Sequence, residues 1–106
     1  MKQFDVYPNQ TATQDIFPYY VILQHDFYRS ARTTIVCPLA TAEAFPQASR
    51  LNPEVRSDRL GDRPLRLAIQ QLTAIDIAEL ADAPLASLSS YRSEIVSALD
   101  LLFTGV

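Results

Sequence analysis

The sequence predicts a mainly β domain with one C-terminal α-helix. Two short segments, residues 19–26 and 32–40, are rich in aromatic and β-branched residues, which pack well on a pleated surface. Only the final stretch, residues 88–103, combines helix-forming residues with apolar positions at helical spacing. The chain of 106 residues fits a single domain, residues 1–106, that buries a core without metal or disulfide support.

The composition narrows the class of protein. Apolar residues make up 48% and charged residues 20%, as in an ordinary globular domain. The net charge of −3 disfavours wrapping nucleic acid over the whole surface. The opening "MKQFDVYPNQ" lacks the apolar centre of a signal peptide, and no run reaches the roughly 18 to 20 residues of a membrane helix. We therefore expect a cytoplasmic protein.

Three strands are expected in the first half of the chain. Residues 3–7 alternate apolar and polar side chains, which indicates a strand closed by Pro8. Residues 19–26 predict a central strand, and residues 32–40 predict its hairpin partner, joined by "FYRSA". Proline cannot donate to a sheet, so Pro38 suits a strand end or a bulge.

A second hairpin is expected further along the chain. Residues 52–60 and 65–72 flank "GDRP", which supplies turn residues, and the first arm looks more exposed. Acidic and basic residues alternate here, a pattern that usually marks a solvent-exposed face. The alternative is a docking surface for an acidic partner. The charged residues are Arg50, Glu54, Arg56, Asp58, Arg59, Asp62, Arg63 and Arg66. Residues 73–88 suit either a last strand or a short turn of helix.

The predicted helix is apolar on more than one side. Ser89 or Ser90 is expected to cap its first turn, with Glu94 near the positive end of the helix dipole. One apolar face holds Ile95, Ala98, Leu99 and Leu102, and a second, overlapping face holds Val96, Leu99 and Phe103. A small sheet covers only one side of such a helix, so we expect the other to pack against an identical subunit.

Catalytic and metal chemistry find little support in the sequence. One catalytic hypothesis uses His25 and Asp26 as acid and base, with Arg29 and Arg32 as a phosphate clamp. Residues 25 and 26 are adjacent in a predicted strand and therefore point to opposite faces, which argues against cooperation. Cys37 lies in an apolar run and suits a small buried hydrophobe better than a reactive thiol. One histidine and one cysteine give no recognised metal spacing, and we expect no metal and no cofactor.

The order and spacing of these segments resemble the CcdB-type toxins of bacterial toxin–antitoxin modules. The opening "QFDVY" is similar to the family's "QFKVY"-like first strand, and "VCPLA" resembles its "VIPLA" strand. The ending "LSSYRSEIVSALDLLFTGV" resembles the family's "LS…I…AI…L.FWGI". The resemblance implies a small curved antiparallel sheet, an SH3-like barrel of the CcdB/MazF type, in a two-fold dimer. The residues implied at that interface are Leu99, Leu102, Phe103 and Val106.

The resemblance also implies a target and the residues that bind it. The family's terminal Trp-Gly-Ile inserts into the A subunit of DNA gyrase, and these positions are Thr104, Gly105 and Val106 here, preceded by Phe103. The family's asparagine one turn earlier corresponds to Asp100. Its apolar pair after the second strand corresponds to Phe27 and Tyr28.

The leading interpretation is therefore a non-enzymatic toxin that traps the gyrase complex with cleaved DNA and is neutralised by a CcdA-like antitoxin. One alternative is a MazF-like endoribonuclease toxin that uses His25 and Asp26. Another is a non-toxic relative that binds only the antitoxin, because Thr104 replaces the family tryptophan, and touches nucleic acid only through that complex. Loss of toxicity on removing Gly105 and Val106 separates the first interpretation from the others.

Overall fold

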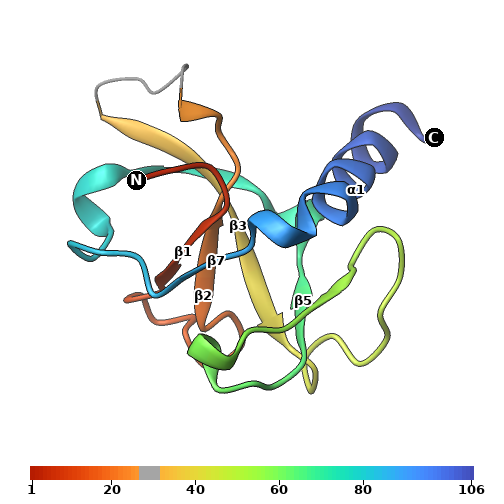
Figure 1. The fold of residues 1–106 in the computed structure, drawn as a ribbon, viewed down its shortest axis with the longest axis horizontal. Helices are drawn as coiled ribbons and strands as arrows, with labels where there is room; N and C mark the ends of the chain where they lie inside the picture. Colours follow the sequence, from red (N-terminus) through yellow and green to blue (C-terminus); the bar gives the residue numbers. More distant parts are fainter. Residues whose placement is uncertain (27–31) are drawn as a thin grey trace.

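A curled antiparallel sheet and one helix make up the computed structural model, which describes residues 1–26 and 32–106 (Figure 1). The strands are β1 (Asp5–Pro8), β2 (Tyr19–Ile22), β3 (Thr33–Thr41), β4 (Glu54–Val55), β5 (Leu65–Leu67), β6 (Thr73–Asp76) and β7 (Ala86–Ser87). Short 3-10 turns are η2 (Asp58–Leu60), η3 (Ile69–Gln71), η4 (Ile77–Glu79) and η5 (Ser89–Tyr91), and the helix α1 is Arg92–Thr104. The predicted fold class, a small curved sheet with a C-terminal helix, is confirmed.

The long strand β3 organises the sheet, whose order is β4-β5-β3-β2-β1-β7. On one edge β3 pairs with β2, and on the other it pairs first with β6 through Val36 and then with β5 from Leu39. Pro38 lies where the partner changes, and its carbonyl accepts a hydrogen bond from the Ala68 N–H at 2.9 Å. Proline is accommodated inside the strand, not at its end. Pro38 pairs with Tyr20 of β2, and its missing N–H faces the opposite edge, where the regular pairing with β6 has ended and that with β5 has not begun.

The strand β2 is shorter than predicted. It ends at Ile22 because the N–H groups of both Leu23 and Gln24 donate to the carbonyl of Ile35, at 2.9 and 3.4 Å, which breaks the regular pairing. The prediction of one strand over residues 19–26 is therefore wrong at its C-terminal half. The hairpin connection predicted at residues 27–31 lies outside the described residues.

The second predicted hairpin is confirmed in β4 and β5. Glu54 pairs with Arg66 and Val55 with Leu65, and β5 is wholly buried while Glu54 is exposed. Its connection, residues 56–64, contains η2. Gly61 at the C-cap of η2 has a φ of 83°, in the left-handed region that glycine adopts without strain.

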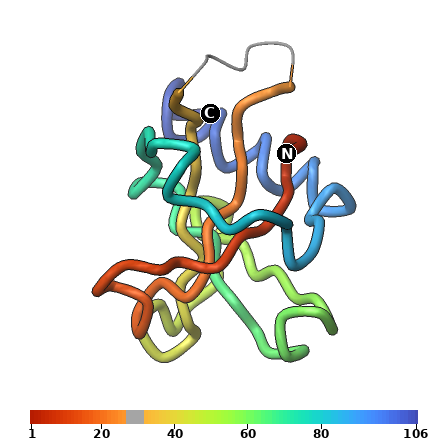
Figure 2. The backbone as a smooth tube through the Cα atoms, turned by 90° about the vertical axis from the view of Figure 1, so that its left-hand side faces the viewer, coloured from red at the N-terminus to blue at the C-terminus, as the bar shows by residue number. Residues whose placement is uncertain are grey.

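The ambiguous segment after β5 contains both a strand and a helical turn. The strand β6 pairs with β3, and η4 follows directly, because the Asp76 carboxylate accepts from the Ala78 N–H while Glu79 accepts from the Asp76 N–H. After Pro84, β7 pairs with β1, which brings the last strand back beside the first (Figure 2). The end of the sheet thus leads straight into the helix.

Two apolar clusters occupy the two faces of the sheet. The larger lies between the sheet and α1 and includes Val21, Cys37, Leu39, Leu67 and Ile95. The smaller contains Tyr7, Ile22 and Val36, covered by partly buried residues of the η4 region such as Leu80. The helix is therefore held against one face of the sheet by a continuous core.

The helix begins differently from the prediction. The turn η5 precedes α1, and Tyr91 at the N-cap of α1 makes no side-chain capping bond. The expectation that Ser89 or Ser90 caps the helix is wrong, because both lie within the preceding helical turn. The hydroxyl of Ser87 accepts from the Ser89 N–H instead, at 3.2 Å. Glu94 lies in the first turn as predicted.

Candidate interaction surface at the C-terminal helix

The helix α1 presents a buried face to the sheet. Ile95 and Ala98 are completely buried in the larger core cluster. Leu99 and Leu102 are half-buried and pack against the same cluster. The first predicted apolar face is therefore the one that anchors the helix, and Leu99 and Leu102 at its C-terminal part remain partly accessible.

The last turn of α1 and the residue after Gly105 carry apolar side chains that the described residues leave largely exposed. Phe103 is 70% exposed and Val106 is 76% exposed, the two largest fractions among the exposed large apolar residues. Figure 1 shows this end of the helix projecting away from the sheet. The sequence-predicted site residues Phe103 and Val106 thus lie together on an accessible tip.

The helix ends in a defined turn. Gly105 adopts a left-handed conformation with φ of 75°, and its N–H donates to the Leu101 carbonyl at 3.0 Å. The hydroxyl of Thr104 donates to the Asp100 carbonyl at 2.6 Å. Asp100 and Thr104 are therefore bonded to each other at the end of the helix, just before Gly105 and Val106. The role of these four residues in target binding stays a prediction.

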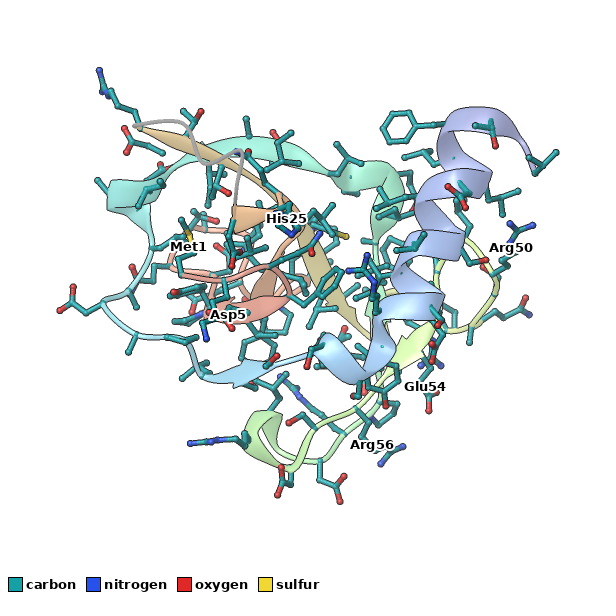
Figure 3. All side chains as sticks on the ribbon, turned by 45° about the horizontal axis from the view of Figure 1, so that its top comes forward. Met1, Asp5, His25, Arg50, Glu54 and Arg56 are labelled. Atoms are coloured by element: carbon teal, nitrogen blue, oxygen red, sulfur yellow. The ribbon has the colours of Figure 1, made fainter. Side chains whose placement is uncertain are left out.

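A charged hollow of about 380 Å³ runs along the side of this helix. The Nε of Arg50 donates to the Ser97 hydroxyl at 2.7 Å, and Figure 3 shows Arg50 lying beside α1. Arg92 lies over the Phe4 ring, with its guanidinium carbon 5.8 Å from the ring centroid. Two arginines and Asp100 therefore flank Val96, which is 37% exposed, so this face is suited to contacts of mixed polarity.

The sheet also carries an exposed apolar residue that was not expected from the sequence. Ile35 is 41% exposed, although it belongs to the central strand and pairs with Ala74 of β6. Side chains alternate along a strand, so Ile35 points to the same side as Cys37 and Leu39, the side that α1 covers further along. The apolar, β-branched character of this strand does not distinguish Ile35 from its buried neighbours.

Two of the predicted target-binding residues, Phe27 and Tyr28, lie outside the described residues, as does Arg29. Their prediction stands as it was made from the sequence.

The residues considered for catalysis are not arranged as an active site in the described part of the chain. The Asp26 carboxylate accepts from the Gln3 N–H at 2.7 Å, and Arg32 forms an ion pair with Asp76 at 3.5 Å. His25 is exposed, and Figure 3 shows it away from the C-terminal end of α1. Asp26 and Arg32 are therefore engaged in separate structural contacts.

Cys37 is completely buried, as predicted, and burial raises the pKa of its thiol because the thiolate would lose its hydration. A buried thiol with a raised pKa is a poor nucleophile. Among the residues that the structure describes, no cluster of histidine, cysteine and acidic side chains could hold a metal ion.

The fold and the exposed helix end define a small curled-sheet protein whose accessible apolar surface suits protein contacts. The family model described as CcdB protein matches residues 3–105, and the chain belongs to the CcdB family. Members of this family are toxins of toxin–antitoxin systems that poison DNA gyrase, and they are not enzymes. The family therefore implies gyrase and an antitoxin as partners.

A search of the curated proteins found no match. Within residues 1–26 and 32–106, no helix has the length and apolar character needed to cross a membrane.

Proposed function

We propose that this chain poisons gyrase as a homodimer that contacts the gyrase A subunit with its paired helix ends. The observation that carries the proposal is the exposure of Phe103 and Val106, at 70% and 76%, on a helix otherwise fixed to the core. Two large apolar side chains on a projecting terminus are the kind of anchor that dominates protein interfaces.

The dimer accounts for the partly covered face of the helix. Leu99 and Leu102 each leave part of their surface accessible beside Phe103 and Val106. A two-fold interface places the same patch on both subunits. The apolar patch of one subunit can therefore cover the identical patch of the other. We assign to this contact the four residues expected from the sequence, with Leu99 and Leu102 at its centre. Phe103 and Val106 lie at its edge, where each keeps part of its surface for gyrase.

Poisoning follows from differential binding. A ligand shifts a conformational equilibrium only by as much as it prefers one state over the others. Two helix ends held at a fixed separation in a dimer fit one arrangement of a two-subunit target better than another. We therefore assign the effect to preferential binding of gyrase in the state that holds cleaved DNA, with Asp100, Thr104 and Gly105 at the same contact.

A CcdA-like antitoxin is the second proposed partner. A segment that folds on binding wraps extended surfaces and can be displaced or degraded when toxicity is needed. Arg66 is buried and paired with Glu54, so it cannot serve an acidic partner. Arg59 is exposed, and Arg63 stacks over the Tyr19 ring at 5.9 Å, so these two residues are the better candidates on the hairpin.

Purified protein incubated with gyrase and supercoiled plasmid tests this function. We expect covalently cleaved plasmid to accumulate with the wild type and to the same extent with His25→Ala, since the histidine has no role in the contact. Cleavage of RNA by the wild type that disappears in His25→Ala would overturn the proposal in favour of the ribonuclease alternative. A protein that neither cleaves RNA nor yields cleaved plasmid would instead indicate a relative that binds only antitoxin.

A further inference from the structure

The hydroxyl of Thr104 joins the helix to the residues beyond it. It donates to the Asp100 carbonyl at 2.6 Å, a short and well-formed bond, and accepts from the Val106 N–H at 3.4 Å, a long one. A threonine hydroxyl often bonds back to the carbonyl four residues earlier, but here the same oxygen also contacts a residue after the helix has ended. One side chain therefore connects both sides of the terminal turn.

The left-handed turn at Gly105 makes this connection possible. Its φ of 75° reverses the chain, so the Val106 N–H returns toward the helix end. A Cβ added at Gly105 would meet no atom within 4 Å, so glycine is needed for backbone conformation and not for space. The glycine permits the turn, and the threonine holds it.

The two most exposed apolar side chains flank this turn. Phe103 precedes Thr104 and Val106 follows Gly105, so the turn sets how the two side chains stand relative to each other. Ordering a loose terminus at the moment of binding costs conformational entropy, and a preformed terminus avoids part of that cost. The hydroxyl proton of Thr104 is committed to the Asp100 carbonyl, so the side chain has no donor left for a target while this bond is made.

We infer that Thr104 is a positioning residue, whose hydroxyl holds Gly105 and Val106 in the conformation that binds gyrase, while Phe103 and Val106 make the apolar contact. This inference rests on the proposed function. It distinguishes two roles among the residues expected at the target: Thr104 arranges the terminus, and its two neighbours fill the interface.

Three full-length proteins test the inference, namely the wild type, Thr104→Val and Thr104→Ser. Valine has the shape of threonine without its hydroxyl, whereas serine keeps the hydroxyl. The measurement is the toxin concentration that gives half-maximal cleaved plasmid with gyrase. We expect Thr104→Val to raise it by about 3- to 10-fold, as for the loss of one or two modest hydrogen bonds. Thr104→Ser should stay within about 2-fold of the wild type.

Two further measurements separate positioning from general stability. The thermal midpoints of the three proteins should agree, because Thr104 is exposed and lies outside the core. The backbone amide resonances of Gly105 and Val106 should shift in Thr104→Val and remain in place in Thr104→Ser. Unchanged resonances in the valine variant would overturn the inference.

The cleavage assay distinguishes the inference from the function it rests on. A wild type that cleaves plasmid, together with a Thr104→Val protein of equal potency, would overturn the positioning role alone. Equal losses in the valine and serine variants would also overturn it, because the hydroxyl would then not be the active feature. A wild type that yields no cleaved plasmid would overturn the proposed function, and the role of Thr104 in gyrase binding with it.

Discussion

The guanidinium of Arg66 donates to the carboxylate of Glu54 across β5 and β4, with Nη1 2.7 Å from Oε1. Arg66 is only 7% exposed, and its Nε has no hydrogen-bond partner within the described residues. Glu54 is therefore the principal counter-charge for a buried cation, and the second hairpin depends on this pair.

We predict that Glu54→Gln lowers the free energy of unfolding by about 1 to 3 kcal/mol, because a buried arginine loses its charged acceptor. The accessible side of Glu54 keeps the effect below that of a fully buried pair. Urea unfolding measures the change, and Glu43→Gln is the matched control, since Glu43 is exposed on the preceding loop. Equal stability of the two variants would show that Arg66 does not depend on Glu54.

The anchoring of the helix gives a second prediction. Ile95→Ala should destabilise the protein by about 2 to 5 kcal/mol, because it opens a cavity in the cluster between α1 and the sheet. Val96→Ala, one residue along the same helix, should change stability by less than about 1 kcal/mol. Denaturant midpoints compare the two variants directly. A larger effect at Val96 would mean that the helix faces the sheet with a different side.

The buried thiol predicts a pH dependence. Burial raises the pKa of Cys37 above its value in the unfolded chain, so the unfolded state loses the thiol proton at lower pH than the folded state. The stability contributed by the thiol is complete below roughly pH 8.5 and falls by about 1.4 kcal/mol per pH unit above it. The wild type should therefore lose more stability than Cys37→Ala between about pH 8.5 and 10. Parallel losses would contradict the burial of the thiol.

The proposed dimer gives a prediction about the oligomeric state. Phe103→Asp should shift the protein toward the monomer in sedimentation experiments, because it places a charge in the proposed interface. Protomer stability should change little, since Phe103 is 70% exposed. The matched control is Ile16→Asp in the loop between β1 and β2, where the side chain is 49% exposed and distant in sequence from the helix. Dissociation by both variants, or by neither, would contradict the proposed interface.

Much of the fold could be predicted from the sequence because local patterns and long-range packing agree. The β-branched and aromatic run at Tyr19–Ile22 forms a strand, and the spacing of Ile95 and Ala98 identifies the buried side of the helix. The helix cap could not be predicted, because Ser87, Ser89 and Ser90 offer equivalent hydroxyls. The position of the turn η5 decides which serine precedes the first backbone N–H that needs a capping partner.

The candidate site could be predicted in part. The resemblance predicted that Phe103, Thr104 and Val106 bind the target, and this stays a prediction. The structure adds that the side chains of Phe103 and Val106 are exposed. The bonds of the Thr104 hydroxyl could not be foreseen, because they depend on the left-handed turn at Gly105.

The central claim is that the terminal residues of α1 bind gyrase and hold it on cleaved DNA. The most direct measurement compares full-length protein with a variant lacking Gly105 and Val106, using purified gyrase and plasmid. Both residues lie beyond the helix and outside the core, so the variant should keep the thermal midpoint of the full-length protein. We predict that cleaved plasmid accumulates only with the full-length protein, whereas equal accumulation with the truncated variant would contradict the claim.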